Sequence, residues 1–261
     1  MLACPTMGIP EPASGRRIVV GIPARYHSTR FPGKALAPLA GRPMIEHVYR
    51  RAAAVSGVAQ VLVATDDERI AAAVRGFGGE ARLTRATHNS GTERLAEVFT
   101  ELECDLVVNL QGDEPLLPAE AIAQALEPFV VDAGLEVSTL KTRLRELDAV
   151  FSPHVVKVVT DEKGYAVTFT RRPLPPLDPE AEFDPERMAY YKHIGLYVYT
   201  RAFLLRLAAL PPTPSEQRER LEQLRILDHG IPIKVVETPY DSIGVDTPED
   251  LARAEALLAR V

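Results

Sequence analysis

The feature that most constrains the fold of this chain is a short apolar run followed at once by a long cationic loop. Residues 17–20 read Arg-Ile-Val-Val and predict a buried strand that ends in Gly21-Ile22-Pro23. The loop that follows, up to Lys34, contains cations, hydroxyls, Pro and Gly, but it has no apolar period. At the carboxyl end of the first strand of an open α/β sheet, such a loop lies where these folds bind ligands.

Three side chains give the loop its positive charge: Arg25, Arg30 and Lys34. An arginine guanidinium can bind two phosphate oxygens at once, and a lysine ammonium supplies a compact charge. The three could therefore neutralise a bound polyphosphate. The alternative is a solvated basic loop, which charge alone favours, because most Arg and Lys side chains lie at the surface.

Predicted strands and helices alternate after the loop. Helices are predicted at 43–55, 68–77 and 92–103, and strands at 59–64, 81–84 and 105–110. This alternating order predicts an α/β fold built on an open sheet.

The second half of the chain changes character. It adds a helix at 118–131, a strand at 136–141, a hairpin with strands at 155–159 and 166–170, a strand at 193–199, helices at 200–210 and 215–228, and a strand at 233–237. A Pro-rich excursion follows the hairpin and extends to about residue 187. We interpret 152–200 as a flap over the sheet, and a flexible linker between two domains is the competing interpretation. Thr247, followed by Pro248 and then by Asp250, predicts the start of the last helix.

Length and charge limit the class of protein. A chain of 261 residues can bury a full core, and we expect residues 18–261 to form one domain. The net charge of −6 argues against a general nucleic-acid binder, so no nucleic-acid partner is expected. No run approaches the roughly 18 apolar residues that a membrane span needs, so we expect no membrane partner.

The N-terminal residues and the cysteines bear on location. Residues 1–17 mix Pro, Gly, Ser and charge without the apolar core of a signal peptide, and we expect a flexible tail there. Cys4 and Cys104 lie far apart and form no metal-ligand spacing, which argues against a zinc site or a disulfide framework. A reduced, cytoplasmic location fits these observations.

Two acidic turns follow predicted strands. Asp113 lies in Gln-Gly-Asp-Glu-Pro after the strand 105–110, and Asp246 comes after the strand 233–237. If both reach one sheet edge, their carboxylates would repel each other unless a cation lies between them. Mg²⁺ is the natural occupant, because it takes oxygen ligands and bridges substrate phosphates. The alternatives are a solvated turn at Asp113 and, at Asp246, a residue that merely precedes a helix cap.

The loop pattern x-I-P-A-R-x-x-S-T-R-x-P-G-K resembles the opening signature of the sugar-activating cytidylyltransferases, in particular those that activate 3-deoxy-manno-octulosonate (Kdo). Further segments keep the order of that family: Gly41-Arg42-Pro43-Met44-Ile45, Ala64-Thr65-Asp66, Ser90 to Val98, Gln111-Gly112-Asp113-Glu114-Pro115, His193-Ile194-Gly195-Leu196-Tyr197, Leu221-Glu222-Gln223-Leu224-Arg225 and Gly244 to Leu251. Each segment alone is weak, but the ordered set is specific.

The resemblance implies a three-layer, Rossmann-like nucleotidyltransferase fold with a central mixed, mostly parallel sheet and a flap that serves dimerisation. It implies Mg²⁺-dependent transfer of CMP from CTP to the anomeric 2-hydroxyl of Kdo, giving CMP-Kdo and pyrophosphate for lipopolysaccharide biosynthesis. A homodimer is expected. No His or Lys stands out as a general base, so the hydroxyl is expected to lose its proton with help from Mg²⁺ or Asp113.

The motifs also carry residue roles. The resemblance assigns catalysis to Arg25, Lys34, Asp113 and Asp246, the last two as Mg²⁺ ligands. The implied nucleotide-binding set is Ala24, Arg25, Arg30, Lys34, Thr65, Asp66, Arg85, Ser90, Gly91 and Thr92. The implied acceptor-binding set is Gln111, Arg171, His193, Tyr197, Glu222 and Gln223. In that set Arg171 and His193 can receive a carboxylate, and the other side chains can bond hydroxyls.

Some features leave the substrate and the class open. Residues 171–176 and 227–230 differ from the sequences usual in the family, which tend to have aromatic residues there. 8-Amino-Kdo and a sialic-acid-type sugar therefore stay as alternative acceptors. A non-catalytic nucleotide- or sugar-binding regulator would lack one metal carboxylate, and both are present here. A metal-dependent glycosyltransferase usually binds its metal through a short D-x-D motif. The comparable segment here is Gln111-Gly112-Asp113, which has Gln at the first position.

Overall fold

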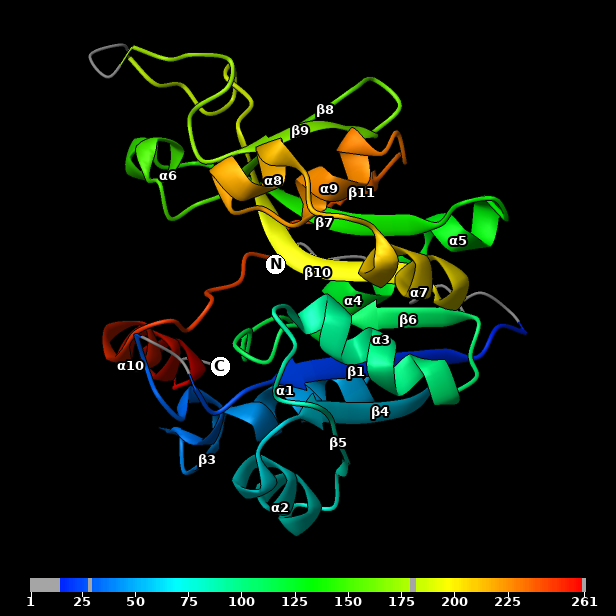
Figure 1. Ribbon diagram of the computed structural model, residues 1–261. Coiled ribbons are helices and arrows are strands. Elements are labelled where there is room, and N and C mark those ends of the chain that lie inside the picture. The colour runs from blue at the N-terminus through cyan, green and yellow to red at the C-terminus, as the bar shows by residue number, and fades with distance from the viewer. Residues whose placement is uncertain (1–14, 28–29, 179–181, 260–261) are drawn as a thin grey trace, which may run out of the picture.

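A mixed sheet runs through the centre of the molecule (Figure 1). The computed structural model describes residues 15–27, 30–178 and 182–259. Within these ranges the sheet has nine strands, and its main path is β11 (Lys234–Glu237), β7 (Val137–Arg143), β10 (Tyr191–Thr200), β6 (Leu106–Asn109), β1 (Ile18–Ala24), β4 (Val58–Thr65) and β5 (Glu80–Leu83). β8 (Lys157–Thr160) pairs with β10 and with β9 (Ala166–Thr170).

Strand directions confirm the predicted mixed, mostly parallel sheet. β6, β1, β4 and β5 pair in parallel, and β11 is parallel to β7. β10 is antiparallel to both β6 and β7, so it is the reversed strand of the main path. The parallel strands β1 and β6 therefore end at the same edge, where the loops that follow them meet.

Helices cover both faces of the sheet, which confirms the predicted three layers (Figure 1). One core includes residues of α1 (Met44–Ala53), α2 (Glu68–Gly76) and α4 (Ala119–Leu126), and the other includes residues of α3 (Gly91–Glu101), α7 (Arg201–Ala209) and α9 (Gln223–Asp228). In β1, Ile18, Val20 and Ile22 belong to the first core and Val19 to the second. Successive strand side chains point to opposite faces, so one apolar strand supplies both cores.

The elements of the first half lie where the sequence predicts them, and polar caps begin two of the helices. Asp67 accepts a hydrogen bond from the backbone N–H of Arg69 at the start of α2, and Ser90 accepts one from Glu93 at the start of α3. Several short elements carry no periodic signal and escape prediction: the 3-10 turn η1 (Lys34–Leu36), β2 (Pro38–Leu39), β3 (Arg42–Pro43) and α6 (Leu147–Phe151).

Two helices predicted as continuous are broken. The predicted helix 118–131 divides into α4 and α5 (Pro128–Val131), because Pro128 has no N–H to donate to Gln124; the N–H of Glu127 bonds that carbonyl at 3.3 Å. The predicted helix 215–228 divides into α8 (Pro214–Glu219) and α9 at Arg220, whose φ of 54° lies in the left-handed region and ends a helix.

The predicted flap at 152–200 needs correction at its C-terminal end. Its last ten residues form β10, which lies between β6 and β7 in the main sheet. Lys157 of β8 pairs with Lys192 of β10, so the β8–β9 hairpin extends the sheet and does not link two domains. The proline-rich excursion between β9 and β10 is the part that stays a candidate flap.

The ends of the described ranges limit two expectations. The N–H of Arg17 donates to the carboxylate of Asp105 at 2.6 Å, so the chain is already tied to the fold at that residue. The rest of the predicted tail, up to residue 14, and Cys4 with it, lie outside the described residues. Among the helices of the described ranges, none combines the length and apolar character that crossing a bilayer requires.

The last helix, α10 (Pro248–Leu258), begins as predicted. The Thr247 side chain accepts a hydrogen bond from the N–H of Asp250, and the Asp250 side chain accepts one from the N–H of Thr247. Asp250 also accepts a hydrogen bond from the N–H of Asp246 at 3.2 Å. The cap therefore fixes the backbone just before the helix as well as the first helical turn.

Replacing the capping threonine should destabilise the protein. We expect Thr247→Ala to lower the free energy of unfolding by about 1 kcal/mol, because it removes the acceptor for an otherwise unpaired N–H. Urea unfolding followed by circular dichroism measures the change. Thr247→Ser keeps the hydroxyl and should remain within about 0.5 kcal/mol of the parent. An equal loss in both variants would assign the effect to the methyl group instead of the cap.

Candidate functional site

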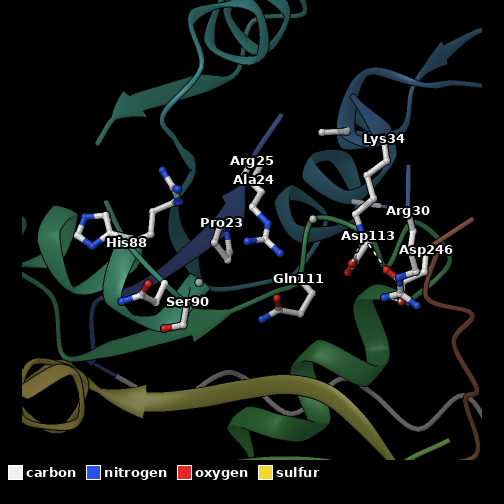
Figure 2. A pocket seen from close by; sticks show the side chains of 15 residues that line it. Pro23, Ala24, Arg25, Arg30, Lys34, His88, Ser90, Gln111, Asp113 and Asp246 are labelled. Atoms are coloured by element: carbon white, nitrogen blue, oxygen red, sulfur yellow. Dashed lines mark hydrogen bonds and ion pairs between the residues drawn. The ribbon is translucent and has the colours of Figure 1, made fainter. Parts of the chain in front are cut away.

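A cavity of about 280 Å³ opens at the carboxyl ends of β1 and β6 (Figure 2). Its described lining comes from four separate stretches: Pro23, Ala24, Arg25, Arg30, Lys34 and Ala35; His88, Asn89, Ser90, Gly91 and Arg94; Gln111, Gly112 and Asp113; and Asp246. The cationic loop thus lies at the ligand-binding edge of the sheet, where its place after the first strand predicts it.

The end of β1 forms the floor of this cavity. β1 pairs with β6 only as far as Gly21, whereas it pairs with β4 up to Ala24. Pro23 therefore lies beyond the part of β1 that pairs with β6. Its missing N–H costs no hydrogen bond to β6. A Cβ atom at Gly91 would lie 2.9 Å from Cγ of Pro23, and one at Gly112 would lie 3.0 Å from its carbonyl oxygen. Both positions need glycine, because two loops pass this close to β1.

Gly33 shapes the loop just before Lys34. Its φ of 73° is a left-handed conformation that glycine adopts without strain. Its N–H donates to the carbonyl of Tyr26 at 2.8 Å. The guanidinium of Arg69 stacks on the Tyr26 ring, 3.3 Å from the ring centroid. These contacts fix the backbone at Gly33, directly before Lys34.

Lys34 joins the two acidic turns. Its Nζ donates to Oδ2 of Asp113 at 2.6 Å, to Oδ1 of Asp246 at 3.0 Å and to the carbonyl of Val245 at 3.2 Å. Nη2 of Arg30 lies 2.8 Å from Oδ2 of Asp246, and Figure 2 shows both cations directed at the aspartates. The predicted convergence of Asp113 and Asp246 is confirmed, because both carboxylates contact the same ammonium.

Charge pairing sets the protonation of this cluster. Burial would lower the pKa of Lys34, but the charge of Asp113 and hydrogen bonds to both aspartates outweigh it and raise that pKa above its ordinary value. Burial would raise the pKa of Asp246, but its hydrogen bond to Lys34 and the charges of Lys34 and Arg30 bring that pKa below its ordinary value. The ammonium and the Asp246 carboxylate are therefore both ionised at neutral pH.

The two carboxylates suit one hard divalent cation. Both accept hydrogen bonds from the same ammonium, so a single cation can contact both. Mg²⁺ is usually held by one or two carboxylates, with waters and substrate phosphates as its other ligands. No group of three or more His, Cys, Asp or Glu that could cage a metal occurs in the described part of the chain. A metal between Asp113 and Asp246 would have to displace the Lys34 ammonium.

Several predicted nucleotide-binding residues line the cavity. Ala24 is the last residue of β1 and Arg25 follows it, and Figure 2 shows the Arg25 side chain entering the cavity. Ser90 and Gly91 line it from the start of α3. The N-terminus of α3, which has eleven residues, therefore faces the same space as the cations of the loop.

Four other predicted nucleotide-binding residues do not line the cavity in the described part of the chain: Thr65, Asp66, Arg85 and Thr92. Thr65 is fully buried and accepts a hydrogen bond from the N–H of Asp67. Oδ2 of Asp66 accepts one from Arg94 at 3.1 Å, and Oδ1 is buried without a partner among the described residues. Arg85 is exposed and pairs with Glu97 at 3.0 Å.

Among the lining residues with polar side chains, three escape prediction: His88, Asn89 and Arg94. His88 lies in the polar turn before α3 and is hydrogen-bonded through Nε2 to Glu97. Its place in a turn rich in polar residues is a signal that could have found it. Arg94 is a nearly buried residue of α3, and a single arginine on an amphipathic helix has no sequence pattern that separates it from a surface residue.

One member of the predicted acceptor-binding set lines the cavity, and three others lie near residues that line it. Gln111 lines it, and a Cβ atom at Gly195 of β10 would lie 3.8 Å from Cγ of Gln111. His193 and Tyr197 flank that point of β10, with ring centroids 5.4 Å apart. The hydroxyl of Thr92, next to the lining Gly91, donates to Glu222 at 2.8 Å.

The acceptor-binding set contains buried polar groups without a partner among the described residues. These are the hydroxyl of Tyr197 and Oε1 of Glu222. Burial, the nearby Tyr199 and Glu222 raise the pKa of Tyr197, and burial raises the pKa of Glu222. Because nearly all buried polar groups in proteins are paired, two unpaired ones beside a cavity are ready to bond a polar ligand.

His193, which is expected to help receive a carboxylate, is a buried histidine. Burial, together with the charge of Lys192, lowers the pKa of His193 to about 3, so the ring is neutral at physiological pH. Its Nε2 lies 3.0 Å from the hydroxyl of Thr139, and its ring packs edge-on against Phe169. In the protein alone, His193 is therefore a neutral hydrogen-bonding group.

Two further acceptor-binding predictions lie farther from the cavity lining. Arg171 follows β9 and donates to the carbonyls of Pro153 at 2.9 Å and Glu219 at 3.4 Å. Gln223 is buried at the start of α9. Neither residue is among the described residues that line the cavity, so their roles stay predictions.

Sequence comparison identifies the family. A profile of the cytidylyltransferases matches residues 19–235. The chain is 53% identical to a 3-deoxy-manno-octulosonate cytidylyltransferase of Geobacter metallireducens, over 94% of this chain and 98% of that protein. It is 52% identical to the protein of the same name from Geobacter sulfurreducens, over 89% of this chain and 95% of the other.

Solved structures give the same result. A CMP:2-keto-3-deoxy-manno-octonic acid synthetase complexed with CTP superposes with a TM-score of 0.86 and 43% identity, over 94% of this chain and 99% of that one. A 4-diphosphocytidyl-2C-methyl-D-erythritol synthase from Anaerococcus prevotii superposes with a TM-score of 0.63 at 15% identity, over 95% and 98% of the two chains. The second match shows a shared fold alone.

Removing the ammonium should expose the repulsion between the aspartates. We expect Lys34→Met to lower the free energy of unfolding by about 1–2 kcal/mol at neutral pH, because two partly buried carboxylates lose their partner. Asp246 has its lowered pKa only when paired, so this contribution to stability is present above pH ~4 and is lost as the pH falls below it. The gap between parent and variant should therefore close in acid, as urea unfolding at several pH values will reveal.

Magnesium supplies the second half of this test. Millimolar Mg²⁺ should raise the melting temperature of Lys34→Met more than that of the parent, because the metal no longer competes with the ammonium. Lys163→Met, at an exposed lysine of the β8–β9 turn, is the matched control and should respond like the parent. An identical Mg²⁺ response in all three proteins would contradict a cation site at Asp113 and Asp246.

Proposed function

The chain belongs to the cytidylyltransferase family, and on this basis we propose that it transfers CMP from CTP to the anomeric 2-hydroxyl of Kdo. The products are CMP-Kdo and pyrophosphate, and the use of CMP-Kdo is lipopolysaccharide biosynthesis. Identity above 50% over most of the chain to proteins named for this reaction supports the substrate pair. The CTP in the similar solved structure supports cytidine as the nucleotide.

The observation that carries the proposal is the meeting of Arg30 and Lys34 with Asp113 and Asp246 at one side of the cavity. Cations and carboxylates in one cavity can hold a triphosphate together with a divalent metal. A non-catalytic binding regulator would need the cations but not both carboxylates. The pair of aspartates therefore favours an enzyme.

We assign the triphosphate to the cationic side of the cavity. The guanidinium groups of Arg25 and Arg30 can each bind two phosphate oxygens. The ammonium of Lys34 can stay paired with the negative charge of the departing pyrophosphate. Backbone N–H groups at Ser90 and Gly91, at the start of α3, offer further donors to phosphate or ribose oxygens. These groups stabilise charge that increases in the transition state.

Asp113 and Asp246 would hold Mg²⁺, which neutralises phosphate charge when bound. With a cation held by these two carboxylates, the Lys34 ammonium would be free to bind the triphosphate. Asp113 lies next to Gln111, on the acceptor side, and is the carboxylate that we assign to take the proton of the Kdo hydroxyl during in-line attack on the α-phosphorus.

We place the acceptor sugar between Gln111 and β10. The unpaired Tyr197 hydroxyl and Glu222 oxygen suit the hydroxyl groups of an eight-carbon sugar acid. Neutral His193 can donate or accept one hydrogen bond there. We also propose a cytoplasmic homodimer, in which the excursion between β9 and β10 contributes to the contact between subunits.

A pyrophosphate-release assay tests the reaction. CTP, ATP, GTP and UTP are each combined with Kdo, 8-amino-Kdo and sialic acid. We expect release with CTP and Kdo to exceed every other combination. Release that does not depend on an acceptor would contradict the synthetase reaction, and preference for 8-amino-Kdo or sialic acid would replace Kdo as the acceptor.

Asp246→Asn should separate catalysis from folding. The change keeps the shape of the side chain but removes a charge, so we expect turnover to fall on the order of 100-fold or more. Circular dichroism and melting temperature should stay close to those of the parent. Glu249→Gln removes an exposed carboxylate nearby and should retain full turnover. Near-normal Mg²⁺-dependent turnover in Asp246→Asn would refute the metal role.

A further inference from the structure

The segment that carries Asp246 has no regular secondary structure of its own. Residues 238–247 connect β11 to α10 without forming a strand or a helix. Asp246 nevertheless has to meet Asp113, which belongs to a turn more than a hundred residues earlier in the chain. Strand pairing does not hold this segment, so individual hydrogen bonds and packing contacts must set the position of the Asp246 carboxylate.

Glu114 links the turn of Asp113 to the segment that carries Asp246. It follows Asp113 directly and accepts a hydrogen bond from the hydroxyl of Ser242. Ser242 is 2% exposed, so this hydroxyl has little access to water as an alternative partner. Oε1 of Glu114 would lie 3.5 Å from a Cβ atom at Gly244, which means that the carboxylate also packs against the backbone two residues before Asp246.

Two other contacts hold the same segment from different directions. The N–H of Val245 donates to the carbonyl of Asp113 at 2.8 Å, which ties the two acidic turns together through their backbones. Nζ of Lys192, on β10, donates to Oδ1 of Asp241 at 2.8 Å and to the carbonyl of Ser242 at 2.5 Å. Ser242 is thus held by a carboxylate on one side and by an ammonium on the other.

We propose that Glu114 is a positioning residue for the metal pair: through Ser242 and Gly244 it holds the 238–247 segment so that Asp246 faces Asp113. Glu114 is not among the described residues that line the cavity, and so it acts through its neighbours. This inference rests on the proposed function, because it assigns Glu114 a role in metal binding at the same site.

The contact with Ser242 requires an acceptor oxygen on the side chain at position 114. Ser242 needs an acceptor oxygen at this distance from the backbone, and either a glutamate or a glutamine supplies one. Alanine supplies none and leaves a gap beside Gly244. Residues that orient metal ligands typically contribute 10–100-fold to metal affinity, so Glu114→Ala should weaken metal binding by at least about tenfold.

The experiment measures metal binding without turnover. Mn²⁺ serves as the probe for the Mg²⁺ site, and its free concentration is followed by electron paramagnetic resonance in the presence of CTP and without any acceptor. We expect the dissociation constant of Mn²⁺ to rise at least about tenfold in Glu114→Ala and to stay within about twofold of the parent in Glu114→Gln. CTP binding without metal should be unchanged in both, since Glu114 does not reach the cavity.

Two further variants keep the test decisive. Ser242→Ala removes the other half of the same hydrogen bond and should weaken Mn²⁺ binding as Glu114→Ala does, with little further loss in the double variant. It provides the answer if Glu114→Ala does not fold. Glu120→Ala, at an exposed glutamate of α4, should bind Mn²⁺ like the parent.

The outcomes separate the two proposals. Parent-like Mn²⁺ binding by Glu114→Ala or by folded Ser242→Ala would overturn the positioning role while the proposed function stands. Weakened binding in Glu114→Gln equal to that in Glu114→Ala would also overturn it, because a retained acceptor should rescue. Failure of the parent itself to bind Mn²⁺ with CTP would overturn the proposed metal role and this inference with it.

Discussion

The contact on which the site depends is the ammonium of Lys34 between the carboxylates of Asp113 and Asp246. Two carboxylates that contact the same ammonium lie close enough to repel each other. The attraction of each carboxylate to the cation between them offsets this repulsion. In the protein alone Lys34 is that cation, with Arg30 beside it. Under the proposed function, a divalent ion and a triphosphate together would replace this internal ion pair.

The sheet topology makes this contact possible. β1 and β6 are parallel neighbours, so the loops that carry Lys34 and Asp113 leave the sheet at the same edge. Asp246 arrives by a different route, through an irregular segment fixed by Glu114, Lys192 and the cap of α10. Reversed β10 pairs with β6 and places Gly195 beside Gln111, with the predicted acceptor-binding residues His193 and Tyr197 two positions away on either side.

Sequence reasoning succeeds where the signal is local or is carried by an ordered set of motifs. Alternating apolar runs predict the strands that flank the site, and Asp113 and Asp246 follow from their places after strands. It fails where tertiary context decides: Arg220 breaks a periodic helix, and β10 joins the central sheet although its neighbours suggest a flap. Arg94 and neutral His193 show the same limit, because burial, which changes what a side chain can do, is not visible in one sequence.

A crystal structure of the protein with CTP and Mg²⁺ tests the central claim most directly. The account predicts a metal ion bonded to both Asp113 and Asp246, with the Lys34 ammonium moved from between them onto a phosphate of the nucleotide. A nucleotide bound elsewhere, or Lys34 still between the two aspartates while the metal lies apart from them, would contradict it.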